Sequence, residues 1–218
     1  MARKTKELAL ETRKKLLESA LGVMSEKPFN TVSIDEIASR VGLSKGAVYW
    51  HFKNKSDLLV NLIRDLCEKN RLDFIEDGNP PENFEDLRRF FRKKLSKADP
   101  SERTQKIKKL LHRGYEWPEE TSAAVKEIIS EKTRLELEMV KRVVALHQER
   151  HEVRTDFTAH EIATLLSAIF HGMFFFHLSE IFSMDFSKYT DFIFGALEKE
   201  LRSGDNVNLG ENAPARSA

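Results

Sequence analysis

A short stretch near the N-terminus gathers side chains suited to binding phosphate. Among the side chains between residues 44 and 55 are the ammonium groups of Lys45 and Lys55, the phenol of Tyr49 and the imidazole of His51. All four groups can donate a hydrogen bond to a phosphate oxygen. Gly46 and Ala47 lie among them and are small, so a partner could approach the backbone closely. The pattern favours an anionic polymer as partner.

Two short helices are expected to position these side chains. Ser33 and Glu36 have the spacing of a capping box, which starts a helix. Ser44 has the same capping role for a second helix, residues 45–51, and Gly42 can supply the positive φ of the turn between them. Two helices joined by such a turn form a helix-turn-helix, whose second helix enters the major groove of DNA.

The run G-A-V-Y-W-H-F followed by K-N-K-S-D-L, residues 46–58, resembles the corresponding segment of the TetR family of bacterial repressors. The resemblance implies phosphate contacts for Tyr49, His51 and Lys55. It implies groove or phosphate contacts for Lys45, Gly46 and Ala47.

Further DNA contacts are expected around this segment. Ser33 and Ser44, at the two helix starts, are candidates for phosphate contact, and Arg3 and Lys4 for a flexible arm that reaches the backbone or the minor groove. Trp50 has two interpretations, packing against the rest of the protein or lying along the sugar–phosphate backbone. We favour packing, because buried aromatic rings are the commoner case.

Charge is unevenly distributed along the 218 residues. Residues 1–55 hold eleven Lys and Arg against six Asp and Glu, which gives +5, whereas the whole chain carries +1. A basic N-terminal part on a mildly acidic remainder indicates an anionic partner at one end only. Cys67 is the only cysteine, so no intrachain disulfide can form, and the charged N-terminus lacks the apolar core of a signal peptide. We expect a cytoplasmic protein.

Helical periodicity runs through the chain, and the fold class expected is all-α with nine helices. Three helices would form a DNA-binding head, residues 1–53, and six a body for ligand binding and dimerisation, residues 54–203; the polar tail, 204–218, is expected to be disordered. Residues 162–179 carry no formal charge, but their His, Ser and Thr content argues for a buried helix and against a membrane span. The count and order of helices also match the TetR fold.

Operator recognition by such heads normally uses a symmetric pair, so we expect a homodimer on a palindromic operator. The resemblance implies that the last two helices form the dimer interface. Its expected members are apolar residues of these helices: Ile162, Leu166, Ile169, Phe192, Ile193, Ala196 and Leu197. The alternative is that these residues only fill the core of one subunit.

Two clusters in the body suit a small-molecule effector, because each combines aromatic with polar side chains. The expected contacts are His112, Tyr115, Trp117, Phe170, His171 and Phe174. The segments M-A-R-K-T-K-E and L-L-H-R-G-Y-E-W are similar to AcrR-type repressors of multidrug efflux pumps. That similarity implies an apolar or cationic effector whose binding tilts the fourth helix and separates the heads.

Other functions stay open at this stage. A TetR-like regulator of lipid or catabolic genes would have an identical head. A helical enzyme is a remote alternative, because His147 and His151 have a spacing that can chelate a metal, but no third ligand is evident. We expect no catalytic residues, no cofactor and no metal.

Overall fold

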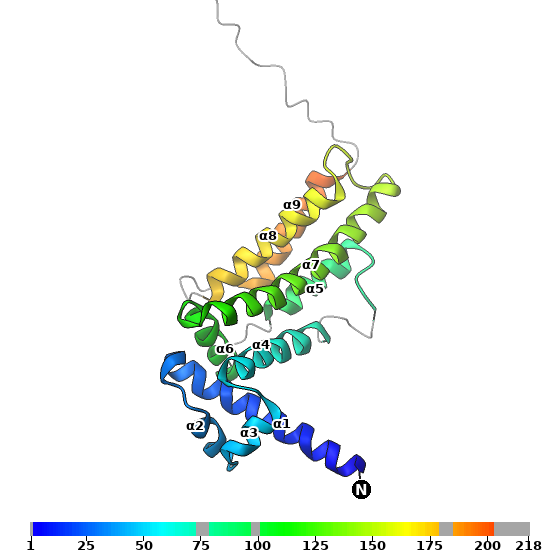
Figure 1. Cartoon of the computed structure of the whole chain (residues 1–218). Coiled ribbons are helices and arrows are strands. Elements are labelled where there is room, and N and C mark those ends of the chain that lie inside the picture. The colour runs from blue at the N-terminus through cyan, green and yellow to red at the C-terminus, as the bar shows by residue number, and fades with distance from the viewer. Residues whose placement is uncertain (1, 73–78, 97–100, 179–184, 203–218) are drawn as a thin grey trace, which may run out of the picture.

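The protein, examined as a computed structural model, is described over residues 2–72, 79–96, 101–178 and 185–202. Within these ranges the regular elements are nine α-helices and two short 3-10 helices, and extended pairing is limited to a single bridge between Val153 and Arg202. The prediction of an all-α fold is therefore confirmed. Figure 1 shows the first three helices at one end of the molecule and α5, α7, α8 and α9 together at the other, with α4 and α6 between them.

The head comprises three helices and a 3-10 turn. They are α1 (Ala2–Glu26), η1 (Phe29–Thr31), α2 (Ile34–Ser39) and α3 (Lys45–His51). The body follows with α4 (Lys55–Leu72), α5 (Phe84–Ser96), α6 (Glu102–His112), η3 (Arg113–Glu116), α7 (Glu119–Glu149), α8 (Ala159–Leu178) and α9 (Phe186–Leu201). These positions agree with the nine helices expected from the periodicity.

A first apolar core, which we call the head core, joins the head to the body. It contains Phe29, Ile37, Ala38, Val48 and Phe52 of the head. It also contains side chains from three body helices: Leu58, Leu59, Leu62, Ile63 and Leu66 of α4, Leu110 of α6 and Val125 of α7. Because burial of apolar surface is the main stabilising term, head and α4 are stabilised together. The proposed boundary after residue 53 thus crosses a continuous core.

A second apolar core, the body core, lies among α5, α8, α9 and the later part of α7. Its centre is a group of three aromatic rings. Phe91 and Phe170 stack with their centroids 4.0 Å apart, and Phe194 lies 5.6 Å from Phe170. Val140, Val143 and Val144 line the same core from α7, so this one helix contributes to both cores.

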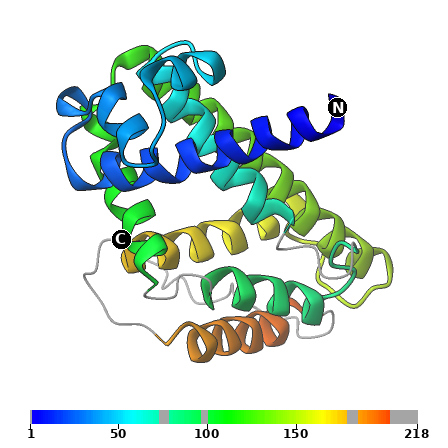
Figure 2. The same ribbon diagram turned by 90° about the horizontal axis from the view of Figure 1, so that it is seen from below.

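Two expectations about the termini have different outcomes. Arg3 and Lys4 were expected to belong to a flexible arm, but α1 begins at Ala2, and its first turns project from the rest of the molecule (Figure 2). The tail 204–218 lies outside the described residues. In the part of the chain that the structure describes, no helix is long and apolar enough to cross a membrane.

Candidate nucleic-acid interface

The turn between α2 and α3 is built from local hydrogen bonds. Ser33 Oγ accepts from the backbone N–H of Glu36 at 3.1 Å, and Ser44 Oγ accepts from that of Ala47 at 3.3 Å. Gly42 has φ +69°, and the next N–H, of Leu43, donates to the Ala38 carbonyl at 3.0 Å. A glycine in the left-handed region ends a helix in this way. The predicted helix-turn-helix geometry is therefore present.

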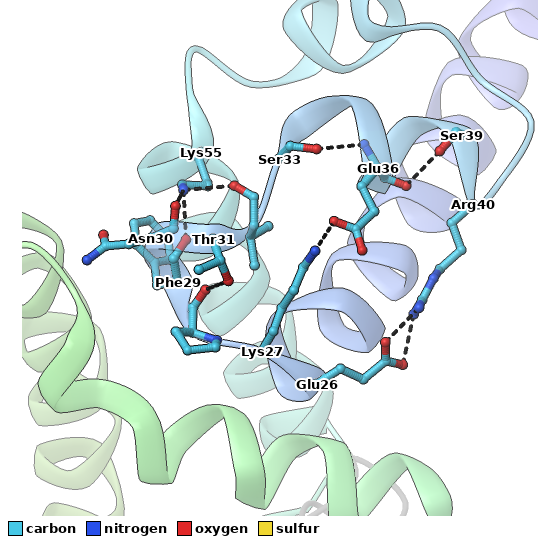
Figure 3. Close-up of polar contacts among 12 residues, drawn as sticks. Glu26, Lys27, Phe29, Asn30, Thr31, Ser33, Glu36, Ser39, Arg40 and Lys55 are labelled. Carbon is cyan, nitrogen blue, oxygen red and sulfur yellow. Dashed lines mark hydrogen bonds and ion pairs between the residues drawn. The ribbon is translucent and has the colours of Figure 1, made fainter.

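One half of the predicted capping box is not formed. The carboxylate of Glu36 was expected to reach back to Ser33, but it accepts instead from the ammonium of Lys27 at the end of α1 (Figure 3). A charged partner offers a stronger hydrogen bond than a backbone N–H. A second ion pair lies beside it, where Arg40 donates to both oxygens of Glu26 at 3.0 and 2.6 Å. This bidentate pair lowers the pKa of Glu26. Both pairs hold α2 against α1.

The outer face of α3 carries most of the predicted DNA-contacting side chains. Lys45, Tyr49 and Trp50 are exposed, whereas Val48 on the opposite face is fully buried in the head core. A methyl group at Gly46 would meet only Ser44 Oγ, at an ordinary 3.7 Å. Packing within the subunit therefore does not require glycine there. The absence of a side chain at Gly46 leaves room for a binding partner to approach the backbone of α3.

Lys45 is not a free cation in this structure. Its ammonium donates to Asp35 of α2 at 2.7 Å, and this hydrogen bond raises the pKa of Lys45. Both side chains are more than half exposed, so water competes with the pair and weakens it. The ammonium of Lys45 can thus exchange Asp35 for a phosphate at a small cost in free energy.

Trp50 differs from the favoured expectation. It was predicted to pack against the rest of the protein, but 73% of its surface is exposed. Within the described part of the chain, the only aromatic ring in contact with it is that of the neighbouring His51, edge to face, with centroids 4.5 Å apart. The short α3 directs positions 49 and 50 outward while Val48 and Phe52 turn inward. The second interpretation, an outward-facing indole beside a partner, fits this placement.

His51 lies at the edge of the same face and is partly buried. Burial lowers its pKa, and the positive charge of Arg13 on α1 lowers it further. Arg13 itself donates to Asn61 of α4 at 3.0 Å and lies over the ring of Phe52. The imidazole of His51 is therefore a neutral donor at neutral pH.

Lys55 is placed differently from the prediction. It was expected to contact phosphate, but its ammonium donates to the backbone carbonyls of Phe29 and Val32 at 2.7 and 2.9 Å, and lies 4.5 Å from the centroid of the Phe29 ring (Figure 3). Burial lowers its pKa. Lys55 thus holds η1 on the start of α4. The exposed Lys53, two residues earlier, was missed by the sequence reasoning and is better placed to reach a phosphate.

The remaining predicted DNA contacts lie at helix starts. Ser33 and Ser44 are exposed, and each side-chain oxygen already accepts a hydrogen bond within the chain. Their hydroxyl hydrogens stay available as donors. Arg3 and Lys4 belong to the helical first turn of α1, and their side chains lie outside what the structure describes. Ala47 is half-buried at the first turn of α3.

The predicted dimer residues divide into two groups. Ile162 and Leu166 are buried in the body core, and Ile169, Ile193 and Leu197 pack against it. For Ile162 and Leu166 the alternative, filling the core of one subunit, is therefore what the structure supports. Phe192, 73% exposed, and Ala196 are exposed on α9. The α8–α9 face also exposes large apolar side chains that the prediction omitted: Leu165, Phe175, Phe176 and Tyr189.

The predicted effector contacts do not come together as one site. His112 and Tyr115 are exposed on α6 and η3, and Trp117 packs against the head core. Phe170 is at the centre of the body core, and the side chain of Phe174 lies outside the described residues. His171 is partly buried, and its Nδ1 donates to the Ser167 carbonyl at 2.7 Å. Sequence neighbours on α6–η3 and on α8 thus face different cores.

A buried ion pair near the aromatic rings of the body core was also missed. Lys94 of α5 donates to both carboxylate oxygens of Glu136 on α7 at 2.5 and 2.6 Å. Both side chains are nearly inaccessible, and burial lowers the pKa of Lys94. The ammonium lies 5.9 Å from the centroid of the Phe91 ring. Their spacing of 42 residues along the chain gives no local sequence signal.

The metal alternative is not supported by the geometry. His147 Nδ1 lies 2.5 Å from a carboxylate oxygen of Glu152, whereas His151 is exposed and has φ +56° just beyond the end of α7. The left-handed residue turns the chain, so the i, i+4 pair no longer shares one helical face. Among the described residues, no three His, Cys, Asp or Glu side chains are grouped to hold a metal ion. Cys67 is partly buried, which raises its pKa and disfavours a reactive thiolate.

Comparison with known proteins agrees with this geometry. Residues 16–62, from the middle of α1 into α4, match the sequence model of bacterial regulatory proteins of the tetR family. The HTH-type transcriptional regulator AcrR of Shigella flexneri is 49% identical over 70 residues, which cover 32% of this chain and 32% of AcrR. The chain thus spans about a third of the length of that relative.

Two further similarities extend over the body. A probable acrEF/envCD operon repressor of Escherichia coli is 25% identical over 179 residues, 79% of each chain. The structure also superimposes on a complex of SmeT with triclosan, with a TM-score of 0.69, 19% identity, and 94% and 99% of the two chains covered. SmeT is the repressor of the Stenotrophomonas maltophilia multidrug efflux pump SmeDEF. This likeness shows that the body shares its fold with such regulators.

The exposed face of α3, the capped helix-turn-helix and the matched segment coincide in the same part of the molecule. On these observations, residues 16–62 form a helix-turn-helix segment of the kind found in bacterial regulatory proteins of the tetR family.

Proposed function

We propose that this protein is a ligand-responsive transcriptional repressor. As a homodimer it binds a palindromic operator, and a small apolar or cationic compound releases it. The observation that carries the proposal is the outward-facing surface of α3, where Lys45, Tyr49 and Trp50 are exposed around a glycine that internal packing does not require.

On this proposal α3 enters the major groove, with its N-terminal turn toward the phosphates. Free N–H groups and the positive end of the helix dipole favour an anion there. Tyr49 donates from its hydroxyl, and Lys53 contacts the backbone at the end of α3. The few base-reading side chains on this face favour partial recognition through DNA shape.

A dimer would use the exposed apolar face of α8 and α9. Phe192 and Phe175 are 73% and 64% exposed, which is unusual for such large apolar side chains unless a partner covers them. A two-fold axis would bring the same face of each subunit together and set two heads one helical turn apart on DNA.

For the effector, the best-suited region of the body is the aromatic group of Phe91, Phe170 and Phe194 beside the Lys94–Glu136 pair. Aromatic faces and one polar pair in an apolar surrounding suit a flat, mostly apolar compound. SmeT, which has the same fold, has been observed in complex with triclosan and is the repressor of a multidrug efflux pump, and this supports an effector site in the body and a role in efflux control. On this proposal the regulated genes include those of a multidrug efflux pump.

The test is a titration of the purified protein against DNA flanking its own gene and against scrambled DNA of equal length, at two salt concentrations. We expect specific binding with a steep salt dependence, released by one of a panel of apolar and cationic compounds. Tyr49→Ala should weaken operator binding without changing the helical content, whereas Tyr115→Ala, which also removes an exposed tyrosine but lies on η3, should leave it unchanged. Equal affinity of wild type and Tyr49→Ala for the operator would contradict the docking of α3.

A further inference from the structure

A separate cavity lies at the far end of the body from the head. Its volume is about 170 Å³, and it is lined by the start of α5, the end of α7, the α7–α8 loop and the end of α9, with one side open to solvent. Phe84, Val153 and Leu201 supply apolar walls, and His147, Glu152, Glu198 and Arg202 the polar groups. It shares no residue with the aromatic group or with the surface of α3.

The walls of this cavity are fixed by backbone hydrogen bonds. The N–H of Arg154 donates to the Leu201 carbonyl at 2.8 Å, and Val153 pairs with Arg202 in an antiparallel bridge. Gln148 of α7 donates to the carbonyls of Arg154 and Phe157, both at 2.8 Å. The loop is therefore attached both to α7 and to α9. A cavity with such walls is preformed, which lowers the entropic cost of binding.

His147 presents one ring nitrogen without a partner. Its Nδ1 lies 2.5 Å from Glu152, and its ring lies 4.9 Å from the ring of Phe84. A carboxylate only accepts hydrogen bonds, so Nδ1 carries the hydrogen in the neutral ring and Nε2 is left as an acceptor. Among the described residues, Nε2 is buried with no hydrogen-bond partner. A buried acceptor of this kind calls for a donor.

Size and charge define the matching ligand. An engineered apolar cavity of about 150 Å³ holds one benzene molecule, so a cavity of about 170 Å³ admits one ring with a small substituent. Glu152 and Glu198 outnumber Arg202 around it, which disfavours an anion. We propose that this cavity binds a small neutral phenol, with the ring against Phe84, Val153 and Leu201 and the hydroxyl donating to His147 Nε2.

Isothermal titration calorimetry of the full chain at pH 7.5 tests this site with phenol, toluene, benzoate and benzylamine. We expect phenol to bind with a dissociation constant on the order of 1 mM or tighter. Toluene has the same ring but no donor, and should bind about five- to tenfold more weakly, as one hydrogen bond predicts. Benzoate and benzylammonium should be weaker than phenol.

Variants separate the hydrogen bond from the cavity. His147→Phe keeps an aromatic ring beside Phe84 and should abolish the preference for phenol over toluene. His160→Phe, which removes an exposed histidine on α8, should retain that preference. Leu201→Trp should fill the cavity and prevent binding of both. Circular dichroism of each variant identifies any that fail to fold, and imidazole ¹⁵N shifts of the wild type report whether Nε2 is unprotonated without any mutation.

Several results would overturn the proposal. These are equal binding of phenol and toluene to the wild type, a preference that persists in His147→Phe, tighter binding of benzoate or benzylamine, a proton on Nε2 in place of Nδ1, or no binding at all. Operator binding plays no part in these measurements, so the site and the proposed repressor function succeed or fail independently.

Discussion

Asp35 is expected to restrain DNA binding, because it holds the ammonium of Lys45 at 2.7 Å on the face of the protein that would meet the operator. Contact with phosphate must break or share this pair, and the carboxylate itself repels the phosphate. Asp35→Asn removes the charge while it keeps the size and polarity of the side chain. We therefore predict that Asp35→Asn binds operator DNA more tightly than the wild type.

The magnitude follows from two contributions. An exposed ion pair contributes about 0–1 kcal/mol, and here both side chains are more than half exposed. Repulsion between one carboxylate and a phosphate about 6 Å away in water is about 0.7 kcal/mol. Together these give a gain of about 1 kcal/mol, or roughly fivefold in affinity at low salt. Salt screens both contributions, so the gain should shrink as the ionic strength rises.

Fluorescence anisotropy with labelled operator DNA at two salt concentrations measures this gain. Asp156→Asn is the matched control, because Asp156 is also an exposed acid paired with a cation, Arg154, but lies at the far end of the body. When Lys45 is also replaced by Met, Asp35→Asn should raise the affinity only by the amount that comes from removing the repulsion between carboxylate and phosphate. The first turn of α2 loses one favourable charge, so urea denaturation should show a loss of about 0.3–1 kcal/mol.

An Asp35→Asn protein that folds normally and binds operator DNA with unchanged or lower affinity would refute this reasoning. An equal gain in Asp156→Asn would also refute it, because the effect would then come from net charge and not from the position of Asp35.

The placement of four other side chains leads to further expected outcomes. Lys55→Met should lower the free energy of unfolding by about 1.5–3 kcal/mol in urea titrations, because it removes charged hydrogen bonds to η1. Lys53→Met should leave the free energy of unfolding unchanged. It should instead reduce the slope of DNA affinity against salt concentration by the amount expected for about one phosphate contact. His51 has a folded-state pKa below its unfolded value, so its contribution to stability is complete above the unfolded pKa, near pH 6.5, and is lost as the pH falls through the folded value. Between pH 7 and pH 5 the free energy of unfolding of His51→Gln should therefore fall less than that of the wild type. Parallel pH dependences of the two proteins would contradict this. Phe192→Asp should weaken dimerisation at least about a hundredfold in sedimentation equilibrium, because a two-fold interface contains the substitution twice; an unchanged dimer would place the interface elsewhere.

The features that sequence predicted well are those fixed within a few residues. The caps of Ser33 and Ser44 and the left-handed Gly42 all depend on partners three to five positions away. Periodicity likewise located the helices, since the buried side of each helix repeats locally. The exception is Glu36, whose carboxylate found a charged partner nine residues earlier.

Features that depend on distant contacts were not predictable in the same way. Lys53 and Lys55 stand two residues apart in one K-N-K run, and only the position of the η1 carbonyls, more than twenty residues earlier, decides which ammonium turns inward. Ile162 and Phe192 are equally apolar in sequence. Their different burial follows from how α5, α7 and α9 pack, which no local pattern contains.

The continuity of the head core constrains how a signal from the body could reach DNA. Leu58 and Leu62 of α4 are fully or almost fully buried with residues of α2 and α3, and Lys55 ties the start of α4 to η1. A displacement of α4 would therefore carry the whole head with it, since leaving the head behind would expose this core to water. The contact that has to yield is then the one between α4 and α7, because α7 reaches from the head core into the body core. An effector beside Phe91 and Phe170 would act on the contact between α4 and α7 from the body side. The movement of α7, more than a change at the head–body boundary near residue 53, would then decide whether the two heads fit the operator.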